Sequence, residues 1–72
     1  MKEEMIDVLR EHAKANINLH KANINVYLKN PSGIGEHSDI MEAMQAELDK
    51  MAMHEDRLEV LDTYFDGYEV EA

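Results

Sequence analysis

Residues 14–20 read Lys-Ala-Asn-Ile-Asn-Leu-His, and residues 21–27 read Lys-Ala-Asn-Ile-Asn-Val-Tyr. Five of the seven positions are identical. A seven-residue offset returns a side chain to nearly the same side of an α-helix, so the repeat stacks equivalent side chains along one face. Residues 22–28 also alternate apolar with other residues, as a strand does. The heptad repeat and the long run without a turn signal favour a helix over residues 3–29.

This predicted first helix carries two apolar stripes. One stripe consists of Met5, Val8, His12, Ala15, Leu19, Ala22 and Val26. The other consists of Ile6, Leu9, Ala13, Ile17, His20, Ile24 and Tyr27. Asn16 and Asn23 lie between the stripes, where they either fix the register of a helical interface or simply border it. An apolar surface this wide predicts a helix with neighbours on two sides.

A proline and two glycines interrupt the pattern in Asn30-Pro31-Ser32-Gly33-Ile34-Gly35. The residue before a proline avoids helical geometry, so we expect a loop over residues 30–37. Ser38 or Asp39 can then cap a second helix over residues 38–66, followed by a tail over residues 67–72. The second helix has a single predicted stripe, made of Ile40, Met44, Leu48, Met51, Leu58, Leu61 and Phe65.

A short loop between two long helices favours an antiparallel hairpin, so the predicted fold is all-α with one domain over residues 1–72. The second helix covers one stripe of the first, and a second copy related by a twofold axis covers the other in a four-helix bundle. A larger ring is the alternative. The residues predicted to contact the second copy are Leu9, Asn16, Ile17, Leu19, His20, Asn23, Ile24, Val26 and Tyr27.

The chain of 72 residues contains no cysteine, so disulfides cannot supplement its small core. Self-association is the remedy that the sequence favours, with a dimer as the expected state. No stretch reaches the ~20 apolar residues of a membrane span, and the N-terminus lacks the apolar core of a signal peptide. We therefore expect no contact with a membrane.

Net charge is −9 and is placed unevenly. Residues 1–35 carry five basic and four acidic side chains, whereas residues 36–72 carry two and twelve. This balance argues against direct binding to nucleic acid and suits a basic protein partner or mimicry of DNA. The residues predicted to bind a protein partner are Glu42, Asp49, Asp56, Glu59, Val60, Tyr64 and Tyr68.

The histidines lack the spacing of helical zinc or di-iron sites, and no arrangement of a nucleophile with a base can be argued. We therefore predict no catalytic, cofactor-binding or metal-binding residue, and no enzyme. Glu47 and His54 are one heptad apart on the inner side of the second helix, where they can approach a histidine of the first.

The string from Asn30 to Asp39, Asn-Pro-Ser-Gly-Ile-Gly-Glu-His-Ser-Asp, resembles short acidic proteins encoded by tailed phages (myoviruses) of marine cyanobacteria. The likeness extends to Asn-Ile-Asn-Val-Tyr-Leu before the loop and to Leu-Asp-Thr-Tyr-Phe near the end. The resemblance implies expression in the cytoplasm of an infected bacterium, and it brings no activity. The expected function is an adaptor or modulator that binds a phage or host protein. A DNA-mimic inhibitor and a minor virion component are the alternatives.

Overall fold

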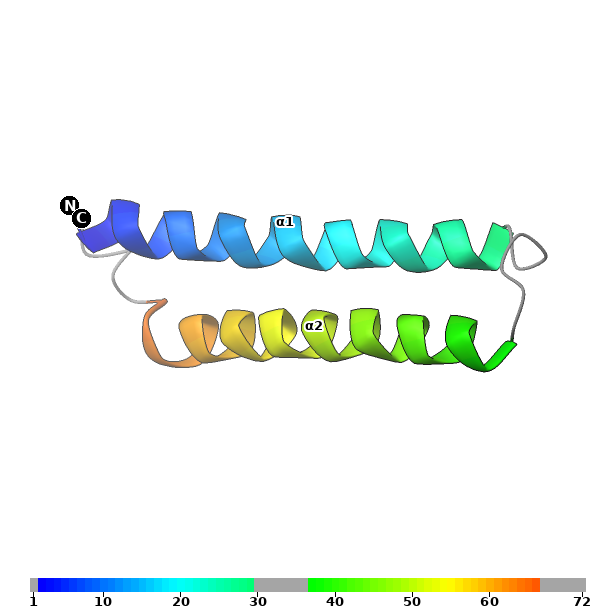
Figure 1. Cartoon of the computed structure of the whole chain (residues 1–72). Helices are drawn as coiled ribbons and strands as arrows, with labels where there is room; N and C mark the ends of the chain where they lie inside the picture. Colours follow the sequence, from blue (N-terminus) through cyan, green and yellow to red (C-terminus); the bar gives the residue numbers. More distant parts are fainter. Residues whose placement is uncertain (1, 30–36, 67–72) are drawn as a thin grey trace.

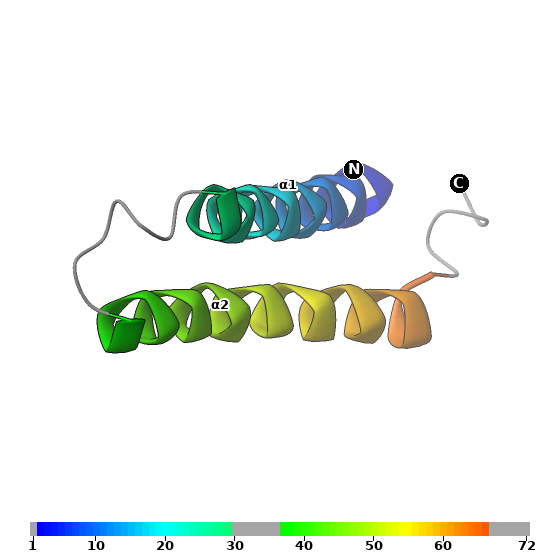
Figure 2. The same ribbon diagram turned by 90° about the vertical axis from the view of Figure 1, so that its right-hand side faces the viewer.

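The chain folds into two helices that run antiparallel and lie side by side (Figures 1 and 2). The structure is a computed structural model that describes residues 2–29 and 37–66. Helix α1 spans Lys2–Lys29 and helix α2 spans His37–Tyr64. Within the two described ranges there is no strand. The predicted all-α, antiparallel two-helix hairpin is therefore confirmed.

The ends of the helices differ by one or two residues from the expected ranges of 3–29 and 38–66. His37, expected in the loop, begins α2, while the rest of the expected loop and the expected tail lie outside the described residues. The backbone N–H of Phe65 still donates to the carbonyl of Leu61, 2.9 Å away, so helical bonding continues just past Tyr64. Acidic side chains in the first turn of each helix complement the positive end of the helix dipole.

Each helix directs one row of side chains toward the other helix, and the members of a row are spaced alternately by three and four residues. This is the heptad pattern, and we call the contact between the two rows the seam. On α1 the less exposed row is Glu3, Ile6, Arg10, Ala13, Ile17, His20, Ile24 and Tyr27. On α2 it is Ile40, Met44, Glu47, Met51, His54, Leu58 and Leu61. The second of the two stripes expected on α1 thus faces α2, and the first does not.

Two leucines of the predicted stripes lie outside the seam. Leu9 is 53% exposed and Leu48 is 52% exposed, so the assignment of Leu48 to the stripe that packs on α1 was wrong. Arg10 and Glu47 take the seam positions next to them, because each finds polar partners on the opposite helix. The stem of an arginine packs as an apolar group while its guanidinium bonds elsewhere, which lets Arg10 occupy a seam position.

The interior of the hairpin is small and half polar. Among the described residues, the buried apolar side chains are Ala13, Ile40 and Leu61, and the buried polar ones are Arg10, His20 and His54. The large apolar side chains that stay exposed are Met5, Val8, Leu9, Leu19, Val26, Leu28, Met41, Leu48, Met53, Val60, Tyr64 and Phe65. A single hairpin therefore leaves most of its large apolar side chains in contact with water.

Neither helix, over its described residues, has an apolar stretch long enough to cross a membrane.

Candidate functional site

A polar layer joins the two helices near their middle. The Nδ1–H of His20 donates to Oε1 of Glu47 over 2.6 Å, and Nδ2 of Asn23 donates to the same oxygen over 2.9 Å. The side chains of His20 and Glu47 are only 10% and 15% exposed. Both hydrogen bonds stabilise the charged carboxylate, so they lower the pKa of Glu47 from its usual value. The bond from Asn23 has the larger effect and the bond from His20 the smaller.

His54 lies next to this layer, between two other imidazoles. Its ring stacks on the ring of His20, with centroids 6.2 Å apart, and meets the ring of His12 edge-on at 5.6 Å. His54 is buried, and its Nδ1 has no hydrogen-bond partner among the described residues. Burial lowers the pKa of His54, and the nearby Arg57, His12 and His20 lower it further. His54 is therefore neutral at pH 7.

We call His12, His20 and His54 the histidine cluster. The sequence predicted that Glu47 and His54 would approach a histidine of the first helix, and the contacts with His20 and His12 confirm this. Within residues 2–29 and 37–66, no group of three or more histidine and carboxylate side chains is placed to hold a metal ion.

His12 links the cluster to the surface of the hairpin. It is exposed, and its Nε2 lies 3.3 Å from Nδ2 of Asn16, which also donates to the carbonyl of His12 over 2.8 Å. Asn16 therefore bonds within α1, whereas Asn23 bonds across to α2.

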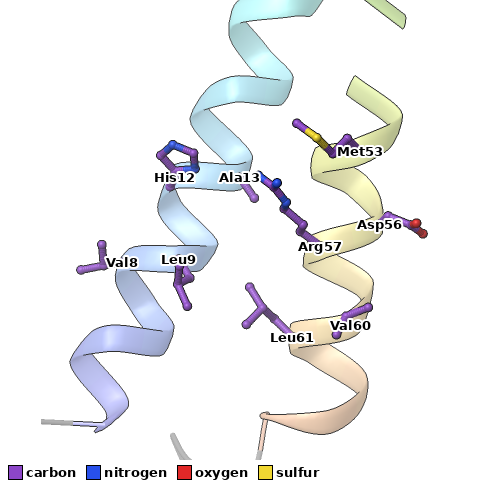
Figure 3. Close-up of a pocket in the computed structure, with 9 residues that line it drawn as sticks. All are labelled: Val8, Leu9, His12, Ala13, Met53, Asp56, Arg57, Val60 and Leu61. Carbon is purple, nitrogen blue, oxygen red and sulfur yellow. The ribbon is translucent and has the colours of Figure 1, made fainter. Parts of the chain in front are cut away.

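A groove runs along the side of the hairpin between α1 and α2 (Figure 3). Its volume is about 700 Å³, and its lining is Val8, Leu9, His12, Ala13, Met53, Asp56, Arg57, Val60 and Leu61. A smaller hollow of about 460 Å³ shares Val8 and Leu9 and continues toward the start of α1 through Met5 and Glu4. Most of the lining is apolar, so water in the groove has few hydrogen-bond partners.

The charges at the groove come from α2. The side chain of Arg57 reaches from α2 toward α1, whereas the carboxylate of Asp56 points away from α1 (Figure 3). No ion pair of Arg57 occurs among the described residues. Within the described part of the chain, Arg57 thus places a cation at an apolar surface and forms no ion pair.

The residues predicted to contact a second copy separate into two groups. Ile17, His20, Ile24 and Tyr27 face α2 in the seam, and Asn16 and Asn23 border it. Leu9, Leu19 and Val26 are exposed, and Leu9 lines the groove. The exposed residues are accessible to another molecule, whereas the seam residues already contact α2 within the hairpin.

The residues predicted to bind a protein partner lie mainly on the outer side of α2. Glu42, Asp49, Asp56 and Glu59 are exposed. Val60 lines the groove and Tyr64 is 72% exposed, while Tyr68 lies outside the described residues.

Sequence reasoning missed Arg10 and Arg57. Arg10 is buried in the seam, where its Nε and Nη2 bond Asp62 and Asp66 over 3.1 and 3.2 Å. Its place four residues after Ile6 and three before Ala13 could have shown that it stands on the seam. Met53 and Arg57 are four residues apart on one face of α2, a spacing that could have shown them as neighbours.

The chain matches no protein-family model, and neither a curated protein nor a solved structure is significantly similar to it.

Proposed function

We propose that this chain is a small non-enzymatic interaction protein that self-associates and binds a second protein. The observation that carries the proposal is the groove, whose apolar lining is left uncovered by residues 2–29 and 37–66. A second copy of the chain is the proposed occupant. Two hairpins packed along their groove sides form a four-helix bundle, the arrangement in which antiparallel helix pairs bury their apolar faces.

The small core of the hairpin supports a second copy as the occupant. Among the described residues only Ala13, Ile40 and Leu61 are buried apolar side chains, which is a weak core, and the chain has no cysteine to add a disulfide. In a twofold pair, both copies contribute the same surface to the interface. The apolar lining of the groove is therefore buried on both copies. Self-association thus adds the burial that a single copy lacks.

The outer side of α2 supports binding of a further, basic protein. Glu42, Asp49, Asp56 and Glu59 are exposed there, and of these four only Asp56 lines the groove. With the resemblance to proteins of tailed phages, we propose an adaptor or modulator of a phage or host protein in the cytoplasm of an infected bacterium. Charge attraction of this kind speeds association and selects partners of opposite sign.

Replacing Leu9 and Val60 together with glutamine is expected to weaken self-association at least about tenfold, because each apolar side chain contributes about 1.5–3 kcal/mol when it is fully buried. Sedimentation equilibrium over a range of micromolar concentrations measures the effect.

The matched control replaces Leu28 and Leu48 with glutamine. These leucines are 61% and 52% exposed and do not line the groove, so the change in composition is similar. We expect the control to associate like the unmodified chain. A monomer at every concentration would contradict the proposal, and so would equal weakening by the two double variants.

A DNA-mimic inhibitor is the second candidate, and the regular acidic row on α2 favours it. Glu42, Asp49 and Asp56 are exposed and one heptad apart, which spaces them by about 10.5 Å along the helix. Repeated carboxylates on a rigid helix can occupy the phosphate-binding surface of a DNA-binding protein.

The two candidates differ in how a captured partner responds to DNA. For a mimic, double-stranded DNA is expected to displace the partner from the immobilised chain, and binding should fall steeply with salt. Replacing Glu42, Asp49 and Asp56 with their amides should remove capture without changing helix content. A partner that stays bound in excess DNA and high salt would contradict the DNA-mimic proposal and favour the adaptor proposal.

A further inference from the structure

Two polar contacts tie the same side of α1 to α2. Arg10 bonds Asp62 and Asp66 over 3.1 and 3.2 Å, and His20 bonds Glu47 over 2.6 Å. Arg10 and His20 are both buried in the row of α1 that faces α2. They are ten residues apart, which is about 15 Å along the helix, so the polar contacts hold α1 at two separate points.

The first stripe of α1 is a second candidate for packing on α2. Met5, Val8, Leu19 and Val26 belong to it, and their side chains are 53–65% exposed. Their spacing is the spacing that a partner helix requires. Apolar periodicity therefore allows two ways of placing α1 on α2, and these differ by a rotation of α1 about its own axis.

We infer that Arg10 and the contact between His20 and Glu47 are specificity determinants, which select the stripe of α1 that packs on α2. In the rotated arrangement Arg10 and His20 turn away from α2, so both lose their partners. Polar groups that find partners in one arrangement disfavour the others, even where they add little net stability. The inference goes beyond the proposed function because it holds within a single hairpin. It also accounts for Val8, a residue of the first stripe, lining the groove.

Arg10 is well suited to a test because its partners remain in water. The side chains of Asp62 and Asp66 are 65% and 64% exposed, so removal of Arg10 leaves neither carboxylate buried. The variant Arg10→Met keeps an apolar stem in the seam. Replacing a buried charged group by an apolar one of similar volume is often neutral or stabilising. We therefore expect Arg10→Met to keep the stability of the hairpin and to lose its preference for one stripe.

Protection of an introduced thiol measures which stripe α2 covers. The chain has no cysteine, so Ala13→Cys and Ala15→Cys each carry a single thiol. Ala13 is 1% exposed in the seam, whereas Ala15 is exposed on the first stripe. Reaction with a small thiol reagent is followed at fixed pH and at the lowest workable concentration, so that self-association shields neither thiol.

We expect the thiol of Ala13→Cys to react about tenfold more slowly than that of Ala15→Cys, because it reacts only when the seam opens. Adding Arg10→Met should lower this ratio of rates by about threefold or more, since the rotated arrangement exposes position 13. Adding His20→Leu and Glu47→Leu as well should bring the ratio close to one. Far-ultraviolet circular dichroism and thermal unfolding of each variant show whether the hairpin is still folded.

Two matched variants control for charge and for packing. Lys14→Met removes the same charge one helical turn from Arg10, where Lys14 pairs with Glu11 of its own helix over 3.9 Å. It should leave the ratio unchanged, and Arg10→Lys, which keeps a cation near Asp62, should retain most of it.

Two results would overturn the inference. If the ratio persists in folded Arg10→Met and in the triple variant, apolar packing selects the stripe. If the ratio falls only in step with the midpoint of thermal unfolding, the polar contacts contribute stability and no selection. Neither result bears on self-association, which sedimentation equilibrium tests separately.

Discussion

Replacing Ala13 with aspartate is expected to abolish the hairpin. Ala13 is 1% exposed in the seam, so aspartate there would overpack the contact between the two helices and bury a carboxylate. Overpacking alone costs about 1–3 kcal/mol, which is a large part of the stability of a small domain. Urea unfolding followed by far-ultraviolet circular dichroism measures the loss.

The matched control is Ala15→Asp. Ala15 is exposed two residues further along the same helix, so both variants add the same charge and lower helix propensity by the same amount. We expect the control to keep most of its helix content at equal protein concentration. Similar loss in both variants would show that propensity and net charge, not burial in the seam, set the stability.

Replacing either His20 or Glu47 with leucine is expected to lower the midpoint of thermal unfolding by about 4–8 °C. Each change leaves polar groups unsatisfied in a site that is 10–15% exposed, because His20 loses its acceptor or Glu47 loses a donor. Replacing both residues together should be much less harmful than the sum, since two leucines at seam positions bury apolar surface instead. Calorimetry on the two single variants and the double variant completes the cycle.

Acid weakens the same layer. The pKa of Glu47 is lowered in the folded hairpin, so the unfolded chain takes up a proton first as the pH falls. The contribution of Glu47 is therefore complete above its ordinary pKa and is lost as the pH falls through the lowered value. The pKa of His54 is also lowered, so its neutral form stabilises the folded chain above pH 6.5, and that contribution is lost as the pH falls through the lowered pKa.

The double-mutant cycle of His20 and Glu47 can also contradict the prediction of coupling. If the losses of the two single variants add up to the loss of the double variant, His20 and Glu47 act independently.

The heptad repeat was enough to predict the helices and the two stripes of α1, but not which of the two stripes α2 covers. Ile17 and Ile24, equivalent in the two copies of the repeat, both lie in the seam with Ala13. The 3-4 spacing is a local property of the chain, so it can be recognised without knowledge of the partner helix. The near approach of His54 to a histidine of α1 also followed from spacing.

Spacing could not choose between neighbouring residues that satisfy it equally well. Between Ile6 and Ala13, both Leu9 and Arg10 fit the 3-4 pattern, and hydrophobicity alone selects the leucine. The structure places Arg10 inside, because Asp62 and Asp66 at the far end of the chain bond its guanidinium. The compensation for a buried charge comes from residues distant in sequence, so no local pattern reveals it.

By itself, therefore, the sequence determined the two-helix hairpin, because the periodicity of apolar residues and the turn signal between the helices are local properties of the chain. The tertiary structure decided that Glu47 rather than Leu48 enters the seam, through its bonds with His20 and Asn23. It also decided that Leu9 and Arg57 meet at an apolar groove and that His12 connects this groove to a buried imidazole. These features depend on which side chains of α2 stand opposite α1, and only the packing of the two helices sets that register.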